Sequence, residues 1–314
     1  MSKFPGALPL DRKVIQSRFR RRKDLLLAAK RGVAFRGVII IVELFGFSFW
    51  GSWALLLDAL SGMFDVLSSL VLIWCIRKAD EPPDESHPLG HGRFEPIAGL
   101  LIGFSLVFLG VFTGFDQIKA MVKGTFDGTI EPIAWIIPFF ALILLEICHQ
   151  ILKNTATRRH SPALMADAYH YRIDALTSFF ALIALGFAAF FPYFASYFDR
   201  FGALSIAFFM IIVGINAFQK NIHQLLDQSP PKEMFEKVHQ AAMKVKGVLG
   251  TEKCLIQVYG PDAHVSLDIE VDPASSVEAS HELTQQVRRE IQIELPMVRD
   301  VIVHVEPYYP GDHS

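Results

Sequence analysis

Apolar residues are gathered into long stretches over the first two thirds of the chain, instead of alternating with polar residues as they do in soluble domains. Each stretch is roughly 20 residues long, which is the length that an α-helix needs to cross the ~30 Å hydrocarbon layer of a membrane. The pattern predicts an α-helical membrane protein with six spans. These spans are residues 33–51, 54–76, 96–118, 131–152, 164–191 and 202–221.

The remainder of the chain has ordinary charge density and short periodic segments. Residues 232–246 and 277–293 have helical periodicity, whereas residues 253–259, 263–271 and 300–305 alternate as strands do. The order α-β-β-α-β predicts a small α+β domain with an antiparallel sheet and helices on one face. We therefore expect three parts: a basic N-terminal segment 1–32, a membrane domain 33–225 and a soluble domain 226–314.

Composition and charge agree with a membrane protein and indicate its orientation. The chain is 52% hydrophobic with a mean hydropathy of +0.34. Ten basic side chains lie in the first 31 residues, and beside a membrane helix such a segment favours anionic lipid over nucleic acid. This segment and the loops on the same side of the membrane together carry sixteen Lys and Arg residues. The loops on the opposite side carry three. The bias places both termini in the cytoplasm, at a plasma or inner membrane.

Two of the predicted spans carry the same polar stripe. Residues 55–69 read LLLDALSGMFDVLSS, and residues 166–176 read ADAYHYRIDAL. In both segments polar side chains recur at i, i+3 and i+7, which places them on one face of a helix. Chance supplies one such stripe more easily than two. The stripe residues are Asp58, Ser61, Asp65, Asp167, His170 and Asp174.

Asp65, His170 and Asp174 are the stripe residues expected deepest in the membrane, where each carboxylate costs about 2.5–3.5 kcal/mol and needs a compensating partner. Two interpretations remain open. The carboxylates form ion pairs with Arg36 or Arg172, or the three side chains together bind a divalent metal ion. Carboxylate and imidazole suit Zn²⁺, Mn²⁺, Fe²⁺ or Co²⁺. Three far-separated cysteines predict neither a disulfide framework nor a thiolate site.

A site made of two carboxylates and one imidazole suits transport because it releases its ion more readily than thiolates do. Metal binding requires the neutral ring of His170, so protons and metal compete for the site. The fourth position around the ion is filled by the Ser61 hydroxyl, by a water, or by nothing. Asp58 and Asp167 are expected nearer the helix ends, as capping residues or as the lining of an access path.

Two further groups of residues are weaker candidates. The loop between the second and third spans contains Asp84, His87 and His91, which are either a metal cluster or solvated side chains. Pro88 and the neighbouring glycines exclude a regular helix here, so the spacing alone does not bring these residues together. The soluble domain has isolated candidates that form a regulatory metal site only if they converge. They are His264, Asp268, His281 and His304, with Glu306 nearby.

The motifs LLLDALSGMFDVLSS, HPLGHGRFEPIAGL and ADAYHYRIDAL resemble those of the cation diffusion facilitators, which are metal/proton antiporters. The resemblance covers roughly residues 30–307. It implies six spans, a cytoplasmic ferredoxin-like domain with metal sites, and a homodimer formed through that domain. It also implies a transport site at Ser61, Asp65, His170 and Asp174, and a second site at Asp84, His87 and His91. The family usually has Asp, His or Asn where Ser61 stands, which leaves four-ligand coordination and the identity of the ion open.

The sequence therefore predicts proton-coupled efflux of a divalent transition metal, with Zn²⁺ first and Fe²⁺, Mn²⁺, Co²⁺ or Cd²⁺ as alternatives. A membrane scaffold or metal sensor without transport activity is a second hypothesis, because Ser61 departs from the family pattern. An intramembrane metalloenzyme is disfavoured, since no His-Glu-x-x-His motif is present and no nucleophile stands beside a base.

Overall fold

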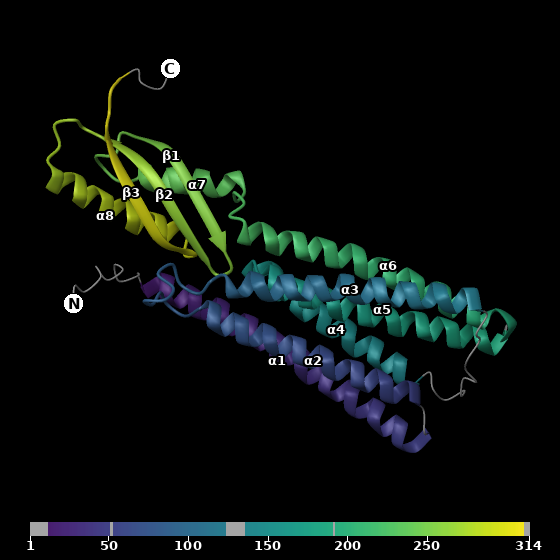
Figure 1. Ribbon diagram of the computed structural model, residues 1–314. Coiled ribbons are helices and arrows are strands. Elements are labelled where there is room, and N and C mark those ends of the chain that lie inside the picture. Colours follow the sequence, from purple (N-terminus) through teal and green to yellow (C-terminus); the bar gives the residue numbers. More distant parts are fainter. Residues whose placement is uncertain (1–11, 51–52, 124–135, 191, 311–314) are drawn as a thin grey trace. The chain divides into compact units, whose positions relative to one another are not determined.

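The computed structural model describes residues 12–50, 53–123, 136–190 and 192–310, and contains six long helices followed by a small α/β domain (Figure 1). The chain divides into two compact units, of which one holds residues 24–222. The other holds the residues from 223 onward with the N-terminal end of α1. The long helices are α1 (Arg12–Trp50), α2 (Trp53–Ala79), α3 (Phe94–Lys123), α4 (Ile136–Arg159), α5 (Pro162–Phe190) and α6 (Pro192–Leu225).

The six predicted spans coincide with these six helices, apart from residues 51, 131–135 and 191, which lie outside the described residues. Among the described residues, four helices are long and apolar enough to cross a membrane. The four segments are Arg12–Phe49, Phe94–Lys119, Ile136–Arg159 and Leu204–Leu225. The helices α2 and α5 carry the two polar stripes, and their assignment as the remaining spans stays a prediction.

The helical unit has an apolar interior and an apolar exterior. Its core contains fully buried side chains such as Leu72, Leu106 and Leu145, and α5 packs against both α3 and α4. Large apolar side chains also cover the outside, among them Phe64, which is 73% exposed, and Phe112, which is 63% exposed. A soluble protein would expose such a surface to water at a high cost, whereas lipid accepts it.

Helices α3 and α6 approach each other closely at glycines. A Cβ atom on Gly103 would lie 2.6 Å from the backbone nitrogen of Phe218, and one on Gly214 would lie 2.8 Å from the carbonyl oxygen of Gly103. Both distances are shorter than real Cβ contacts, so a side chain at either position would push the helices apart. Small residues at helix contacts are typical of membrane bundles, where close backbone packing replaces the hydrophobic effect.

The second unit confirms the predicted order α-β-β-α-β. Its elements are α7 (Lys232–Met243), β1 (Gly250–Tyr259), β2 (Asp262–Val271), α8 (Val277–Glu294) and β3 (Val298–Pro307). The sheet has the order β1-β2-β3, and α7 and α8 pack against each other and against it. Along β2 the alternating side chains of Val265, Leu267 and Ile269 are buried, as their spacing predicts.

The prediction of a purely antiparallel sheet is wrong. The strands β1 and β2 are antiparallel and joined by a tight turn at Gly260, whereas β2 and β3 are parallel. The reason is the 18-residue helix α8 between β2 and β3, which returns the chain to the starting end of β2. A helical crossover of this length joins parallel strands, whereas antiparallel neighbours need only a short turn.

Candidate metal centre

Three predicted ligands meet between α2 and α5. Asp65 projects from α2, while His170 and Asp174 lie one turn apart on α5, where the spacing i, i+4 puts them on one face. The Nε2 atom of His170 is 2.9 Å from Oδ1 of Asp65 and 3.8 Å from Oδ2 of Asp174. One ligand atom from each residue lies within 4.8 Å of the other two. The two stripes of the sequence therefore face each other.

The spacing suits a first-row metal ion. Ligands about 2.1 Å from a tetrahedral ion are separated from one another by about 3.4 Å, and the observed separations lie on both sides of that value. The three side chains are between 13% and 20% exposed, so the cluster is mostly but not fully enclosed. Small side-chain movements would bring the three donor atoms around a single cation.

Arg36 of α1 reaches the same carboxylates. Its Nη2 atom donates a hydrogen bond to Oδ2 of Asp65, and its Nη1 atom is 3.4 Å from Oδ2 of Asp174. The other candidate cation, Arg172, instead pairs with Glu146 of α4. The carboxylates therefore form ion pairs, with Arg36, as the first interpretation predicts. Asp65, His170 and Asp174 also lie close enough together for the metal site of the second interpretation, so the two interpretations are compatible.

The other stripe residues lie differently. The side chains of Ser61 and Asp58 are outside the described residues. Asp167 is buried near the start of α5, where its Oδ1 atom accepts a hydrogen bond of 3.1 Å from the Ser69 hydroxyl of α2. This contact, which the sequence analysis did not predict, ties α5 to α2 one helical turn from the cluster. The serine at i+4 from Asp65 in α2 is the sequence feature that could have suggested it.

The loop between α2 and α3 forms a second cluster from Asp84, His87 and His91. Oδ1 of Asp84 accepts hydrogen bonds from the backbone nitrogens of Ser86 and His87, at 3.0 and 2.7 Å, and Oδ2 is 3.4 Å from Nε2 of His91. A turn, not a helix, brings the residues together, with Gly90 at a φ of 88°. The hydrogen bonds from Ser86 and His87 lower the pKa of Asp84 to about 2, so this carboxylate is ionised at neutral pH.

The candidates of the soluble domain are not gathered into one group within a single chain. His304 stands opposite Asp268 in the β2–β3 register and 3.7 Å from Glu306, whereas His281 lies on α8. His264 is partly buried, and burial lowers its pKa. In the described ranges, the only groups of three or more metal-binding side chains are the two clusters above. A tail metal site therefore stays a prediction.

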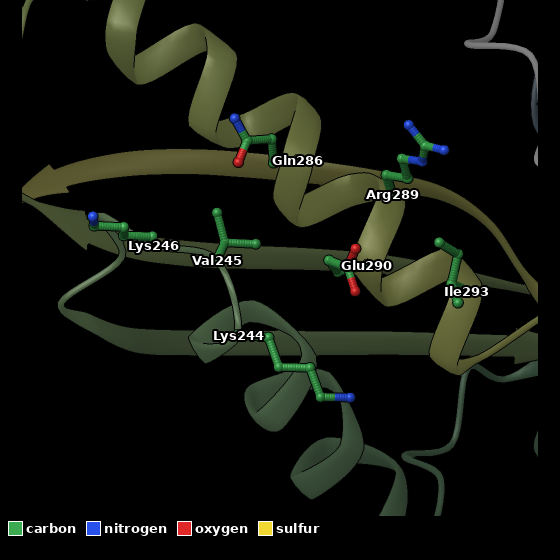
Figure 2. A pocket seen from close by; sticks show the side chains of 7 residues that line it. All are labelled: Lys244, Val245, Lys246, Gln286, Arg289, Glu290 and Ile293. Carbon is green, nitrogen blue, oxygen red and sulfur yellow. The ribbon is translucent and has the colours of Figure 1, made fainter.

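A hollow of about 450 Å³ lies between the end of α7 and α8 (Figure 2). Lys244, Lys246 and Arg289 contribute three cationic side chains to its lining, and Glu290 the single carboxylate. Ammonium and guanidinium groups have no lone pair to donate to a metal at neutral pH, so this hollow is unsuited to a divalent cation. Among the described residues, the groups of three or more side chains that could hold a metal ion are those of the helical unit and of the loop between α2 and α3.

Comparison with known families decides what kind of protein this is. Residues 29–226 match the family model of the cation efflux transmembrane domain, and residues 230–308 match that of the cation efflux protein cytoplasmic domain. The chain belongs to the cation efflux family. Cation efflux proteins of this family, the cation diffusion facilitators, are multi-pass membrane transporters and not enzymes.

Several relatives of the cation efflux family align over most of this chain. An uncharacterized transporter of Methanocaldococcus jannaschii is 29% identical over 82% of this chain and 89% of its own length. Metal tolerance protein C1 of Arabidopsis thaliana is 27% identical over 82% of this chain and 57% of its own length. The manganese efflux system protein MneP of Bacillus subtilis is 22% identical over 82% of this chain and 88% of its own length.

Proposed function

We propose that this chain exports a divalent transition-metal ion from the cytoplasm in exchange for protons, with Zn²⁺ first and Fe²⁺ or Mn²⁺ as alternatives. The observation that carries the proposal is the convergence of Asp65, His170 and Asp174 between α2 and α5. Two carboxylates and one imidazole form a donor set for borderline divalent cations. The relatives support the class of ion, since one is named for manganese efflux and another for metal tolerance.

Proton exchange follows from the imidazole. His170 binds metal only through a neutral nitrogen, so a proton and a metal ion exclude each other at Nε2. In the structure Nε2 lies 2.9 Å from Oδ1 of Asp65, the position of a hydrogen bond that a bound metal would replace. Protonation from the outside would favour release of metal, and loss of the proton to the cytoplasm would favour reloading.

The proposed unit is a homodimer with both termini in the cytoplasm. The C-terminal residues match the cytoplasmic domain of the family, and the excess of Lys and Arg on one side gives the same orientation. Metal bound by residues of the soluble domain, such as His281 and His304, would draw two such domains together. Cross-linking at engineered cysteines in α8, with and without Zn²⁺, tests both the dimer and its response to metal.

The experiment that tests transport measures metal flux into proteoliposomes with an imposed pH gradient. Zn²⁺, Fe²⁺, Mn²⁺, Co²⁺ and Cd²⁺ are compared in one preparation. We expect His170→Ala and Asp65→Ala to reduce flux to the level of empty liposomes. Glu146→Gln is the matched control, because Glu146 is an intramembrane carboxylate that pairs with Arg172 outside the cluster. Undiminished flux in both cluster variants would exclude this transport site.

A metal sensor without transport activity is the second candidate. It is favoured by Arg36, whose guanidinium already contacts both carboxylates of the cluster and offsets part of their charge, and by Ser61 in the place of a usual ligand. A sensor would bind metal at the cluster and show no flux under any pH gradient. Binding and flux measured on the same preparation separate the two functions.

A further inference from the structure

We propose that Arg36 is a tethered cation that occupies the transport site when no metal is present, so that a metal ion binds by displacing its guanidinium group. The inference deepens the proposed function and rests on it. It assigns to α1 a role in setting the affinity of a site whose ligands all come from α2 and α5.

The contacts of Arg36 place it on the ligands themselves. Its guanidinium bridges two helices, because Nη2 binds Oδ2 of Asp65 on α2 while Nη1 lies 3.4 Å from Oδ2 of Asp174 on α5. Oδ2 of Asp174 is also the oxygen 3.8 Å from Nε2 of His170. The guanidinium and a metal ion would therefore share Oδ2 of Asp174. They would also bind the same Asp65 carboxylate, which faces Arg36 with Oδ2 and His170 with Oδ1. Both cannot hold these carboxylates at once without close repulsion between positive charges.

The packing around Arg36 is shaped for its side chain. The residue is only 6% exposed, although it lies in a segment of α1 that is apolar enough to cross a membrane. Gly62 of α2 faces it, and a Cβ atom there would lie 3.0 Å from Nε of Arg36 and 3.0 Å from Cγ1 of Ile40. The absence of a side chain at position 62 thus leaves room for the guanidinium stem between the two helices.

The charge of an arginine makes this role physically useful. A guanidinium group stays protonated at every physiological pH, so its charge does not depend on the pH on either side of the membrane. Two carboxylates in a membrane domain need a positive partner at all times. With Arg36 in place, both carboxylates keep a positive partner when no metal is bound, and the same group lowers the affinity for metal and so promotes release.

The test is equilibrium binding of Co²⁺ to the full-length protein in detergent, followed by the visible absorbance of the bound ion. The loop cluster is silenced in every protein by Asp84→Asn with His87→Ala. We expect Arg36→Gln to bind Co²⁺ at least tenfold more tightly than the parent, and Arg36→Lys, which keeps the charge, to remain within about threefold of it. Arg172→Gln is the matched control, because it removes an intramembrane arginine that pairs with Glu146 instead, and its affinity should be unchanged.

Thermal unfolding separates competition from a structural role. Without metal, Arg36→Gln should unfold several degrees below the parent, and saturating Co²⁺ should remove most of that difference. An equal loss of Tm with and without Co²⁺, or binding that is weaker or unchanged in Arg36→Gln, would overturn the proposal. Asp65→Asn, made in the same background, distinguishes a failure of the proposal for Arg36 from a failure of the proposed transport site. If it abolishes binding while Arg36→Gln weakens it, only the role of Arg36 is wrong; if it leaves binding intact, the transport site itself is wrong.

Discussion

The Oδ1 atom of Asp65 and the Nε2 atom of His170 lie 2.9 Å apart, although 105 residues separate them in the chain. The contact joins α2 to α5, and the nearby hydrogen bond between Ser69 and Asp167 joins the same helices a second time. The two halves of the cluster are therefore held close together by contacts between protein side chains. A site assembled in advance loses less conformational entropy when it binds its ion.

Replacing Ser61 by Asp should change the ion preference of the transporter. Position 61 precedes Asp65 by one helical turn, so a carboxylate there would reach the same ion and complete a set of four charged or imidazole ligands. We expect the flux ratio of Zn²⁺ or Cd²⁺ to Mn²⁺ to rise by about tenfold, as four-ligand sites favour the tetrahedral ions. Ser61→Ala is the control for loss of the hydroxyl alone. An ion profile identical in all three proteins would place residue 61 outside the coordination shell.

The loop cluster should depend on Asp84 to the same degree at mildly acidic and at neutral pH. Because hydrogen bonds from Ser86 and His87 lower the pKa of Asp84 to about 2, the carboxylate is ionised throughout the range from pH 6 to pH 7.5. The comparison is made in proteins that carry Asp65→Asn, which removes binding at the cluster between α2 and α5. In this background, adding Asp84→Asn should weaken Co²⁺ binding by about tenfold at both pH values. Any loss of affinity that both proteins share on acidification belongs to the imidazoles. If the ratio of the Co²⁺ affinities of the two proteins fell towards one at pH 6, protons would be competing for Asp84 in this range.

Gly103→Ala should destabilise the helical unit. The added methyl group would meet the backbone of Phe218 at 2.6 Å, and backbone atoms cannot rotate away as the end of a side chain can. Separation of α3 from α6 should cost roughly 1–3 kcal/mol, the usual range for overpacking. The control is Gly37→Ala, since a Cβ atom at Gly37 would have no neighbour within 4 Å. Thermal unfolding in detergent should show a clear drop in Tm for the first variant only, and equal behaviour of both would contradict the close approach.

Asp262→Ala should destabilise the C-terminal unit far more than Asp300→Ala. The Asp262 side chain is fully buried, and its two oxygens lie 2.7 Å from Nη1 of Arg18 and 2.8 Å from Nε of Arg299. Removal of the carboxylate leaves two largely buried guanidinium groups without it, at a cost of about 3–5 kcal/mol. Asp300 is 47% exposed where it meets Arg288, and an exposed pair contributes about 0–1 kcal/mol. Hydrogen exchange of β1 and β2 in the full-length protein measures the difference, and similar protection in the two variants would rule it out.

Much of the fold follows from local periodicity. The apolar stretches locate all six long helices, and the alternation of Val265, Leu267 and Ile269 locates the buried face of β2. The direction of β3 relative to β2 could not be predicted from local periodicity. A connection makes two strands parallel only if its helix runs back along the sheet, and this depends on where that helix begins and ends. The spacing of Asp84, His87 and His91 likewise does not reveal that a turn gathers them.

The sequence by itself determined which side chains share a face of one helix, because 3.6 residues per turn fixes the positions i, i+3, i+4 and i+7 whatever surrounds the helix. The placement of His170 and Asp174 on one helix face, and the repeat of their stripe around Asp65, were therefore predictable. Only the tertiary structure decided which arginine joins them. Arg36 and Arg172 both lie on long helices and both are cationic, but the rotation of α1 and α5 about their axes aims one at the cluster and the other at Glu146. That rotation is set by packing between helices, to which apolar positions such as Gly62 contribute by leaving room for the Arg36 side chain.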